Sequence, residues 1–273
     1  MTSEDARHAL VNTHTEAAGL SLFARVSALP LPPQAPAVVM VHGLVVSSRY
    51  MVPTAKRLAR YCRVAIPDLP GYGHSAKPPR ALNVPQLADA LAAWMVAAGF
   101  PRAVLLGNSF GCQVVVDLAV RYPERVARAI LVGPTTDPRA RTAHQQVGRW
   151  LLNLPGEPLG LGLVVARDVW DMGIPRALAT FRHMLRDDVA AKLPRVQAPT
   201  LVVRGGHDTS VPQRWCEEAV RLLPRARLVV IPGAAHTLNY NSPRRLLRVT
   251  LPFILGHDAG YETCTPPYTG ADR

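Results

Sequence analysis

The chain has 273 residues, of which 48% are apolar and 18% are charged. This composition excludes a disordered chain, and the length allows one large domain or two small ones with a full buried core. The formal net charge of +12 can indicate an acidic substrate, a nucleic acid or an anionic surface. The basic residues are nearly all arginine and are scattered, without a nucleic-acid-binding motif, so we expect no nucleic-acid partner. Steering of an acidic substrate stays an alternative.

Features that report on the cellular compartment predict a cytoplasmic protein. Residues 1–5 carry two acids where a secretory signal peptide requires a basic start and an apolar stretch. No run of about eighteen apolar residues occurs, so we expect no membrane-spanning segment and no membrane partner. Cys62, Cys112, Cys216 and Cys264 lie far apart without a C-x-x-C pair, which favours free thiols over a zinc site or a disulfide framework.

In chain order, short apolar runs alternate with helical patterns after a polar lead-in at residues 1–17. Continuous β-branched runs are typical of strands that are buried on both faces of a parallel sheet. The predicted strands cover 20–29, 37–41, 63–66, 103–106, 129–132, 199–204 and 227–231. The predicted helices cover 50–61, 84–98, 113–121, 212–223 and 243–255. This alternation predicts an α/β fold with a mainly parallel sheet that helices cover on both sides.

The alternation of strands and helices stops between residues 135 and 195. Helical patterns there are interrupted by Pro155, Pro158 and Pro175, and no strand pattern is present. A long insertion after one strand is expected to form a helical cap above the carboxyl edge of the sheet. We therefore predict a core at 1–134 and 196–257, a cap at 135–195 and a flexible tail at 258–273.

The segment Gly107-Asn108-Ser109-Phe110-Gly111 has the features of a nucleophile elbow. It follows a predicted strand and precedes a predicted helix, which is the context that the G-x-S-x-G pattern requires. A side chain at 107 or 111 would collide with the neighbouring strand or helix, which explains the two glycines. The turn is expected to hold Ser109 in a strained conformation with its hydroxyl clear of the sheet. Ser109 is therefore the predicted nucleophile.

Two further side chains could complete the site. A serine hydroxyl needs a base within hydrogen-bond reach, and that base needs a third group to orient it. His236 follows the last predicted strand and Asp208 follows the strand before it, so both belong at the same sheet edge as Ser109. Asp137, soon after the strand 129–132, is the rival acid. We favour Asp208 because it follows its strand immediately, after two glycines.

An oxyanion hole needs two N–H donors near the serine. One is the backbone amide of Phe110, directly after the nucleophile, and the other should come from the loop after strand 37–41. In that loop, Leu44 follows His42-Gly43, and its side chain is immaterial because its amide is the donor.

Other polar candidates have structural interpretations. His42 precedes a glycine in a loop, where hydrogen bonds to the backbone are common, and Asp68 precedes a turn that is expected to bury it. The segment 71–76 matches the G-x-G-x-x-A dinucleotide fingerprint. Pro78 and Pro79 follow it, so no helix can begin there to receive a pyrophosphate. We predict no cofactor and no metal.

Five motifs in order resemble the α/β-hydrolase superfamily, in its branch of serine esterases, lactonases and meta-cleavage-product hydrolases. They are His42-Gly43, Asp68-x-x-Gly71-x-Gly73-x-Ser75, Gly107-x-Ser109-x-Gly111, Gly205-x-x-Asp208 and Gly233-x-x-His236. The resemblance implies a mainly parallel eight-stranded sheet with a helical cap inserted after the sixth strand. It also implies a Ser109-His236-Asp208 triad, with the amides of Leu44 and Phe110 as the oxyanion hole.

The function expected from these residues is hydrolysis of a small-molecule ester, lactone or thioester through an acyl-enzyme, without a cofactor. Serine at the elbow excludes the family members with an aspartate nucleophile. The Gly-Asn-Ser elbow also appears in carbon–carbon bond hydrolases, where methionine and a double glycine usually follow, whereas Phe110-Gly111-Cys112 stands here. Cleavage of a ring-fission product is therefore one alternative. A non-catalytic ligand sensor on the same fold is the alternative of another class.

Overall fold

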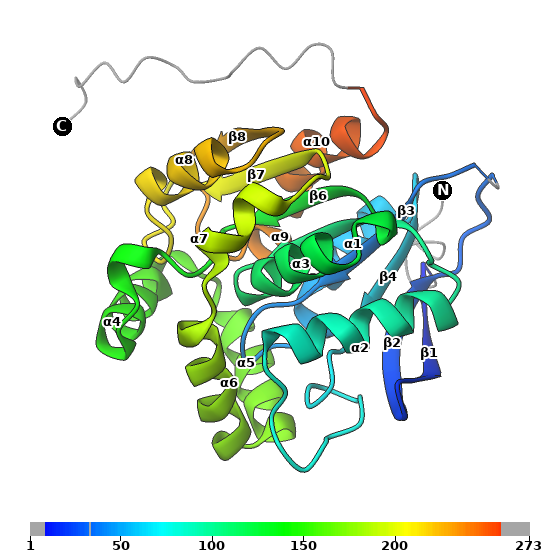
Figure 1. Cartoon of the computed structure of the whole chain (residues 1–273), viewed down its shortest axis with the longest axis horizontal. Coiled ribbons are helices and arrows are strands. Elements are labelled where there is room, and N and C mark those ends of the chain that lie inside the picture. Colours follow the sequence, from blue (N-terminus) through cyan, green and yellow to red (C-terminus); the bar gives the residue numbers. More distant parts are fainter. Residues whose placement is uncertain (1–8, 33, 258–273) are drawn as a thin grey trace.

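The computed structural model describes residues 9–32 and 34–257, which form an eight-stranded sheet flanked by helices (Figure 1). The strand order is β1-β2-β4-β3-β5-β6-β7-β8. β1 pairs antiparallel with β2 and β2 antiparallel with β4, while all the remaining pairs are parallel. The predicted mainly parallel α/β sheet is confirmed. The predicted tail at 258–273, and Cys264 within it, lie outside the described residues.

The strands are β1 (Leu10–Ala17), β2 (Leu20–Ser27), β3 (Ala37–Val41), β4 (Arg63–Pro67), β5 (Ala103–Asn108), β6 (Val126–Val132), β7 (Thr200–Gly205) and β8 (Ala226–Ile231). The longer helices of the sheet layers are α1 (Val52–Leu58), α2 (Val84–Ala97), α3 (Phe110–Arg121), α8 (Gln213–Leu222) and α10 (Pro243–Ile254). Short helices add η1 (Ser48–Met51) before α1 and α9 (Leu238–Asn241) before α10. Every residue of β5 and β7 is buried, as their continuous apolar runs predict.

The strand β1 corrects one expectation from the sequence. The polar lead-in predicted at 1–17 is wrong for residues 10–17, which pair with β2 along the whole length of both strands. β1 lies at the edge of the sheet, and only its last residue is buried. The half-buried side of this edge strand includes Thr13 and Thr15, so its sequence LVNTHTEA lacks the apolar alternation that usually signals a strand.

Helices cover both faces of the sheet and bury two apolar clusters. Leu105 and Leu106 are neighbours on β5, so their side chains point to opposite faces and belong to different clusters. The Leu105 cluster includes Trp215 of α8 and residues of α2 and α3. The Leu106 cluster includes Phe253 of α10 and residues of α1. These two layers hold the carboxyl ends of the central strands at one common edge, where the predicted site residues lie.

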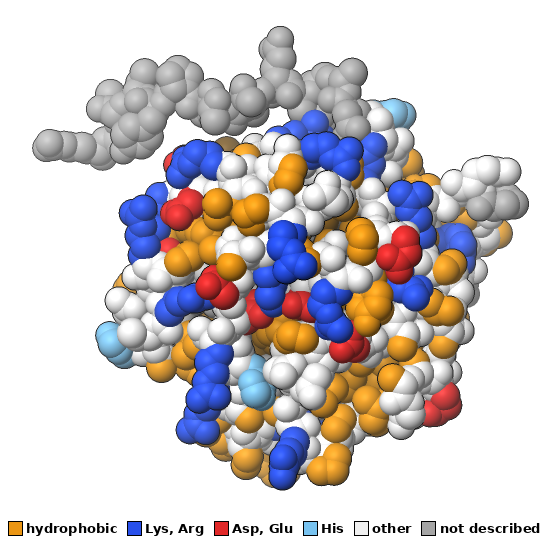
Figure 2. All heavy atoms as spheres, in the orientation of Figure 1, with side chains coloured by type: hydrophobic (Ala, Val, Ile, Leu, Met, Phe, Trp, Pro, Cys, Tyr) orange, Lys and Arg blue, Asp and Glu red, His pale blue; other side chains and the backbone are white. Residues whose placement is uncertain are grey.

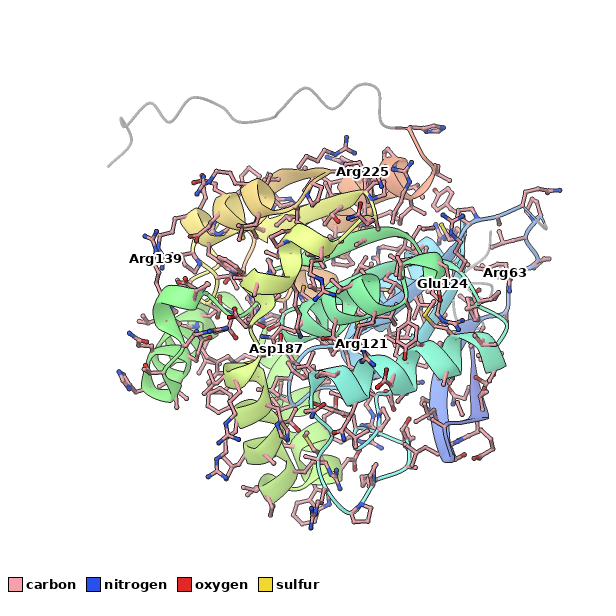
Figure 3. All side chains as sticks on the ribbon, in the orientation of Figure 1. Arg63, Arg121, Glu124, Arg139, Asp187 and Arg225 are labelled. Atoms are coloured by element: carbon pink, nitrogen blue, oxygen red, sulfur yellow. The ribbon has the colours of Figure 1, made fainter. Side chains whose placement is uncertain are left out.

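Between β6 and β7 the chain forms a helical insertion. Its helices are η3 (Pro138–Ala140), α4 (Ala143–Asn153), η4 (Leu154–Gly156), α5 (Leu159–Met172), α6 (Ile174–Arg186), α7 (Val189–Lys192) and η5 (Leu193–Arg195). Figure 1 shows α4, α5 and α6 gathered at one end of the molecule. The Lys192 ammonium of α7 contacts Asp117 of α3 at 2.6 Å and also pairs with Asp187, which Figure 3 labels. These ion pairs connect the insertion to the sheet layers. That residues 135–195 form a separate cap domain stays a prediction.

Surface charge and thiols follow the expectations from composition. Figure 2 shows arginine and lysine side chains spread over one face of the molecule, with fewer acids among them.

Cys62, Cys112 and Cys216 are free, buried thiols, and burial raises the pKa of Cys62 to about 12. Within residues 9–32 and 34–257, no helix combines the length and the apolar character needed to cross a bilayer.

Candidate active site

Ser109 occupies the sharp turn between β5 and α3. Its backbone has φ 55° and ψ −121°, a conformation that costs a non-glycine residue free energy and is found mostly at functional sites. The N–H of Ser109 donates to the carbonyl oxygen of Val132 at 2.9 Å, which ties the turn to the end of β6. α3 begins at Phe110, three residues earlier than predicted, so the positive end of the helix directly follows the serine.

The two glycines of the elbow are required by close backbone approach. A Cβ atom on Gly107 would lie 2.7 Å from the carbonyl oxygen of Gly111. A Cβ atom on Gly111 would lie 2.6 Å from the carbonyl oxygen of His42, at the end of β3. Both distances are shorter than van der Waals contact and involve backbone rather than flexible side chains. The steric explanation predicted for both glycines is confirmed.

Gly111→Ala is expected to destabilise the fold by at least about 2 kcal/mol, because the added methyl group must displace the backbone at the end of β3. Gly148→Ala in α4 is the matched control, since its Cβ would meet nothing within 4 Å. There alanine should stabilise by about 0.5–1 kcal/mol through helix propensity. Urea denaturation of the three proteins measures both changes. Equal stability of Gly111→Ala and the wild type would contradict the packing argument.

His236 and Asp208 form a buried hydrogen-bonded pair. Nδ1 of His236 lies 2.7 Å from Oδ2 of Asp208. The other carboxylate oxygen accepts N–H donors from Ser210 at 2.8 Å and Val211 at 2.9 Å, so the carboxylate cannot rotate freely. Asp208 follows β7, and His236 lies in the loop after β8. The carboxylate therefore holds the imidazole in one orientation and favours the tautomer with the proton on Nδ1.

The electrostatics of this pair favour a charged imidazole. Burial lowers the pKa of His236, but the nearby charge of Asp208 and the hydrogen bond to it outweigh this effect, so the pKa is raised above its ordinary value. A histidine oriented in this way can take up a proton on Nε2 and keep it beside the carboxylate. This is the property that a general base requires.

The end of β6 lies between the Ser109 turn and the His236–Asp208 pair. Val132 accepts the Ser109 N–H, and a Cβ atom on the next residue, Gly133, would lie 2.9 Å from Nδ1 of His236 and 3.3 Å from Oδ2 of Asp208. The glycine has φ 55°, and its missing side chain leaves room for the imidazole. The structure thus brings all three residues to one sheet edge. Among the described residues, the hydrogen bonds join His236 to Asp208 but not to the Ser109 hydroxyl.

The loop after β3 lies against the serine from the other side. A Cβ atom on Gly43 would be 3.4 Å from the Cβ atom of Ser109. The Gly43 N–H donates to the Tyr50 hydroxyl at 3.2 Å, and that hydroxyl donates to Asn108 of the elbow. Leu44 is the next residue of this loop. Phe110 opens α3, and the first N–H groups of a helix lack intrahelical acceptors. The assignment of both amides to an oxyanion hole stays a prediction.

The rival acid, Asp137, has other partners. Its carboxylate contacts Arg149 at 2.9 Å and Arg214 at 3.1 Å, and it accepts the N–H of Arg139 at 3.0 Å. Burial raises the pKa of Asp137, but these arginine and backbone hydrogen bonds outweigh it and leave the pKa lowered. Asp137 therefore holds the insertion and α8 together, and the carboxylate that contacts His236 belongs to Asp208.

His42 and Asp68 have the structural roles that were predicted. His42 is buried, its Nε2 accepts the N–H of Leu69 at 3.0 Å, and burial lowers its pKa, so it is neutral. The Asp68 carboxylate accepts N–H groups of Ser48 at 2.6 Å and His74 at 2.9 Å. The turn at 71–76 closes on this carboxylate, and the next helix, α2, begins only at Val84.

Two contacts at the site carry no signal in the sequence. Arg204 of β7 is buried, and its guanidinium donates to the carbonyl oxygens of Asp208 at 2.7 Å and Val211 at 2.8 Å, which supports the acid loop. Glu157, just after η4, accepts the N–H of Thr237 at 2.9 Å and so holds the loop that carries His236. Glu157 and Thr237 are 80 positions apart, so they meet only after the chain folds.

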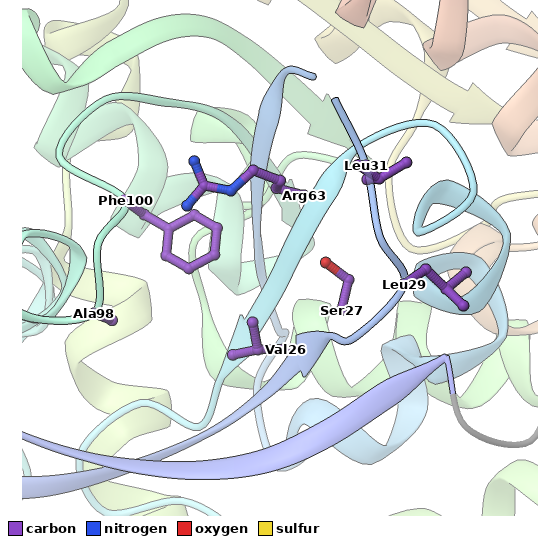
Figure 4. A pocket seen from close by; sticks show the side chains of 7 residues that line it. All are labelled: Val26, Ser27, Leu29, Leu31, Arg63, Ala98 and Phe100. Atoms are coloured by element: carbon purple, nitrogen blue, oxygen red, sulfur yellow. The ribbon is translucent and has the colours of Figure 1, made fainter. Parts of the chain in front are cut away.

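A surface pocket lies away from this site. Figure 4 shows it beside the start of β4 and the end of α2, at the amino ends of the strands. Its lining residues are Val26, Ser27, Leu29, Leu31, Arg63, Ala98 and Phe100. Because none of them is a predicted site residue, this pocket takes no part in the chemistry considered below.

Comparison of the chain with known proteins identifies its family. The model of the Alpha/beta hydrolase family matches residues 38–249. The chain is 28% identical to the carbamate hydrolase candidate RutD of Pseudomonas savastanoi pv. phaseolicola, over 81% of this chain and 94% of that protein. It is 26% identical to the 2-(acetamidomethylene)succinate hydrolase of Mesorhizobium japonicum, over 80% of this chain and 88% of that protein.

A solved structure supports the fold independently. The crystal structure of a membrane phospholipase A, described as a novel bacterial virulence factor, is similar with a TM-score of 0.78. That comparison covers 94% of this chain and 89% of the other, at 21% identity, and it bears on the fold alone. The family match spans the elbow, the acid loop and the histidine loop, and the protein is therefore a member of the alpha/beta hydrolase family.

Proposed function

We propose that the protein is a serine hydrolase that cleaves a carboxylic ester, lactone or thioester through an acyl-enzyme. The observation that carries this proposal is the buried His236–Asp208 pair, which lies across Gly133 from the strained serine of the elbow. The Asp208 carboxylate holds Nδ1 of the buried imidazole, so His236 can act as a base only through Nε2. Nε2 therefore needs a proton donor nearby. Ser109 stands at the same sheet edge to supply that proton.

The proposed reaction begins with transfer of the Ser109 proton to Nε2 of His236 while the serine oxygen attacks the substrate carbonyl carbon. The resulting oxyanion accepts hydrogen bonds from the amides of Leu44 and Phe110. His236 then gives its proton to the departing alcohol or thiol, and the acyl group stays on Ser109. Water, deprotonated by His236, attacks the acyl-enzyme and releases the acid. Asp208 stabilises the charged imidazole in both halves of the cycle.

The relatives suggest a second substrate class. The names of both curated relatives describe hydrolysis of nitrogen-containing compounds, a carbamate and an acetamidomethylene succinate. The same attack on a carbonyl carbon cleaves a carbon–nitrogen bond when His236 protonates a departing nitrogen instead of an oxygen. A carbamate or related acyl–nitrogen substrate is therefore the second candidate. Carbon–carbon cleavage of a ring-fission product is the remaining alternative.

A substrate panel tests the proposal directly. The purified protein is assayed with p-nitrophenyl esters of short and long acyl chains, lactones, a thioester, carbamates and a ring-fission dienoate. We expect turnover of at least one ester, lactone or thioester, with kcat/KM well above that for the carbamates. Turnover of carbamates alone would move the assignment to the second candidate. Turnover of the dienoate alone, followed by its absorbance, would establish carbon–carbon cleavage instead.

A further inference from the structure

The insertion carries most of the large apolar side chains that are exposed within residues 9–32 and 34–257. Of fourteen large apolar residues that are exposed in the described part of the chain, ten lie between Val147 and Leu178. Leu159, Leu163 and Trp170 of α5 are the most exposed, at 96%, 77% and 87%. Isolated exposed leucines are ordinary on protein surfaces, but a concentration on neighbouring helices marks a surface that contacts something apolar.

The spacing of these residues places them on one side of α5. Residues 159, 163 and 170 are separated by four and seven positions, which returns the chain to the same helical face. We call this the α5 outer face. The opposite side of α5 carries Leu161 and Asp168, both buried. α5 therefore buries one side within the described part of the molecule and exposes large apolar residues on the other.

A buried anchor fixes the orientation of α5. The Asp168 carboxylate accepts the N–H of Ser47 at 2.7 Å and pairs with the Arg49 guanidinium. Asp171, one turn along the helix, contacts the same guanidinium at 2.7 Å. Because these contacts hold the inner side of α5 against the loop before η1, the helix cannot turn its outer face inward without breaking them.

The exposed charged side chains of α5 and α6 are all positive. On α5 and α6 the exposed charged residues are Arg167, Arg182 and Arg186. The only acids on these helices, Asp168 and Asp171, are paired with Arg49. A second copy of the chain, with its own charge of +12, would bring like charges together at this surface. An anionic lipid surface complements both the arginines and the apolar face.

The segment that leads into α5 contacts the candidate site. Just before α5, a Cβ atom on Gly156 would lie 3.2 Å from the Cβ atom of Ala235, the neighbour of His236. Glu157 binds the N–H of Thr237, on the other side of the histidine. The segment that leads into α5 therefore borders the loop that carries the proposed base.

We propose that the α5 outer face docks on an anionic lipid surface and that the substrate is an acyl compound held in that surface. The second half of this inference rests on the proposed function, whereas docking does not. The inference replaces the expectation, drawn from the sequence, that the protein has no membrane partner. The docking is peripheral, because the leucines and tryptophan enter only the outer layer of the lipid while the arginines contact its head groups.

Vesicle sedimentation tests the docking. The wild type is mixed with vesicles of phosphatidylcholine, with or without phosphatidylglycerol, and binding is followed in the pellet and by the blue shift of tryptophan emission. We expect binding to the anionic vesicles that weakens with added salt. The triple variant Leu159→Gln, Leu163→Gln, Trp170→Gln should bind about a thousandfold more weakly, because each inserted side chain contributes about tenfold.

A matched control removes three exposed apolar side chains from other parts of the surface. Tyr61→Gln, Val96→Gln, Leu255→Gln changes residues that are 46%, 49% and 42% exposed and should leave vesicle binding unchanged. The proposal is overturned if the wild type does not bind anionic vesicles, or if both triple variants lose binding equally. A wild-type dimer in sedimentation equilibrium that the α5 variant dissociates would show that a second copy covers the face, and would also overturn it.

Two further measurements separate failure of docking from failure of the proposed function. The α5 triple variant should hydrolyse a short, soluble p-nitrophenyl ester at the wild-type rate and lose turnover only of a long-chain ester presented in anionic vesicles. Ser109→Ala should bind vesicles as tightly as the wild type does, but it should hydrolyse neither ester. Vesicle binding by a wild type that hydrolyses no ester would retain the docking and reject the proposed function. Equal long-chain turnover by the α5 variant and the wild type would reject the role of the face in substrate delivery.

Discussion

Replacing Ser109 by alanine is expected to reduce turnover of a short p-nitrophenyl ester to near the rate of buffer alone, a loss of roughly 10⁴- to 10⁶-fold. The mutation removes the only atom of the proposed mechanism that becomes covalently bound to the acyl group. The residual rate would come from substrate binding and the backbone amides, which remain in place. Steady-state kinetics measure the loss, and circular dichroism with thermal unfolding verifies that the variant is folded.

A fluorophosphonate probe provides the matching chemical test. The wild type should be labelled on Ser109, as located by mass spectrometry of the digested protein, and Ser109→Ala should not be labelled. Ser242→Ala is the control, because Ser242 precedes α10 without a side-chain capping bond and lies outside the site. It should keep full labelling and turnover. Undiminished ester turnover in folded Ser109→Ala would reject the proposed nucleophile.

The largest effect after that of the nucleophile is expected at the acid. Asp208→Asn should reduce kcat by roughly 10⁴-fold, because an amide cannot stabilise the charged imidazole and favours the wrong tautomer of His236. Asp137→Asn is the comparison within the same protein. It leaves Arg149 and Arg214 without their carboxylate, so it should lower the melting temperature while kcat stays within a few-fold of the wild type. The opposite order of effects on kcat would transfer the acid role to Asp137.

The pH dependence of kcat/KM reports on the same pair. His236 must be neutral to accept the serine proton, so activity should fall as the pH drops below the pKa of His236. The charge and hydrogen bond of Asp208 raise that pKa above its ordinary value against the effect of burial. In Asp208→Asn both of these effects are lost while burial still lowers the pKa of His236, so the acid limb of the residual activity should move to lower pH. An acid limb at the same pH in both proteins would contradict the assignment of His236 as the base.

Much of the fold could be predicted because its signals are local. The apolar run of β5, the two glycines and the start of α3 lie within a few residues of one another, so the elbow is visible from sequence spacing alone. The same holds for the alternation of strands and helices and for Asp208 directly after β7. By contrast, β1 was missed because the half-buried side of this edge strand carries threonines rather than large apolar residues, so the apolar periodicity of a strand is absent.

The amino-acid sequence by itself determined the α/β class, the elbow at Ser109 and the position of the histidine and acid at strand ends, because turn chemistry and side-chain periodicity act over short distances along the chain. Tertiary structure decided which acid contacts His236, since the two partners are 28 positions apart and Asp137 is occupied by arginines. It also decided which side of α5 faces solvent, through the bond from Ser47 to Asp168, 121 positions apart. Contacts between such distant residues depend on how the layers pack, which no local pattern records.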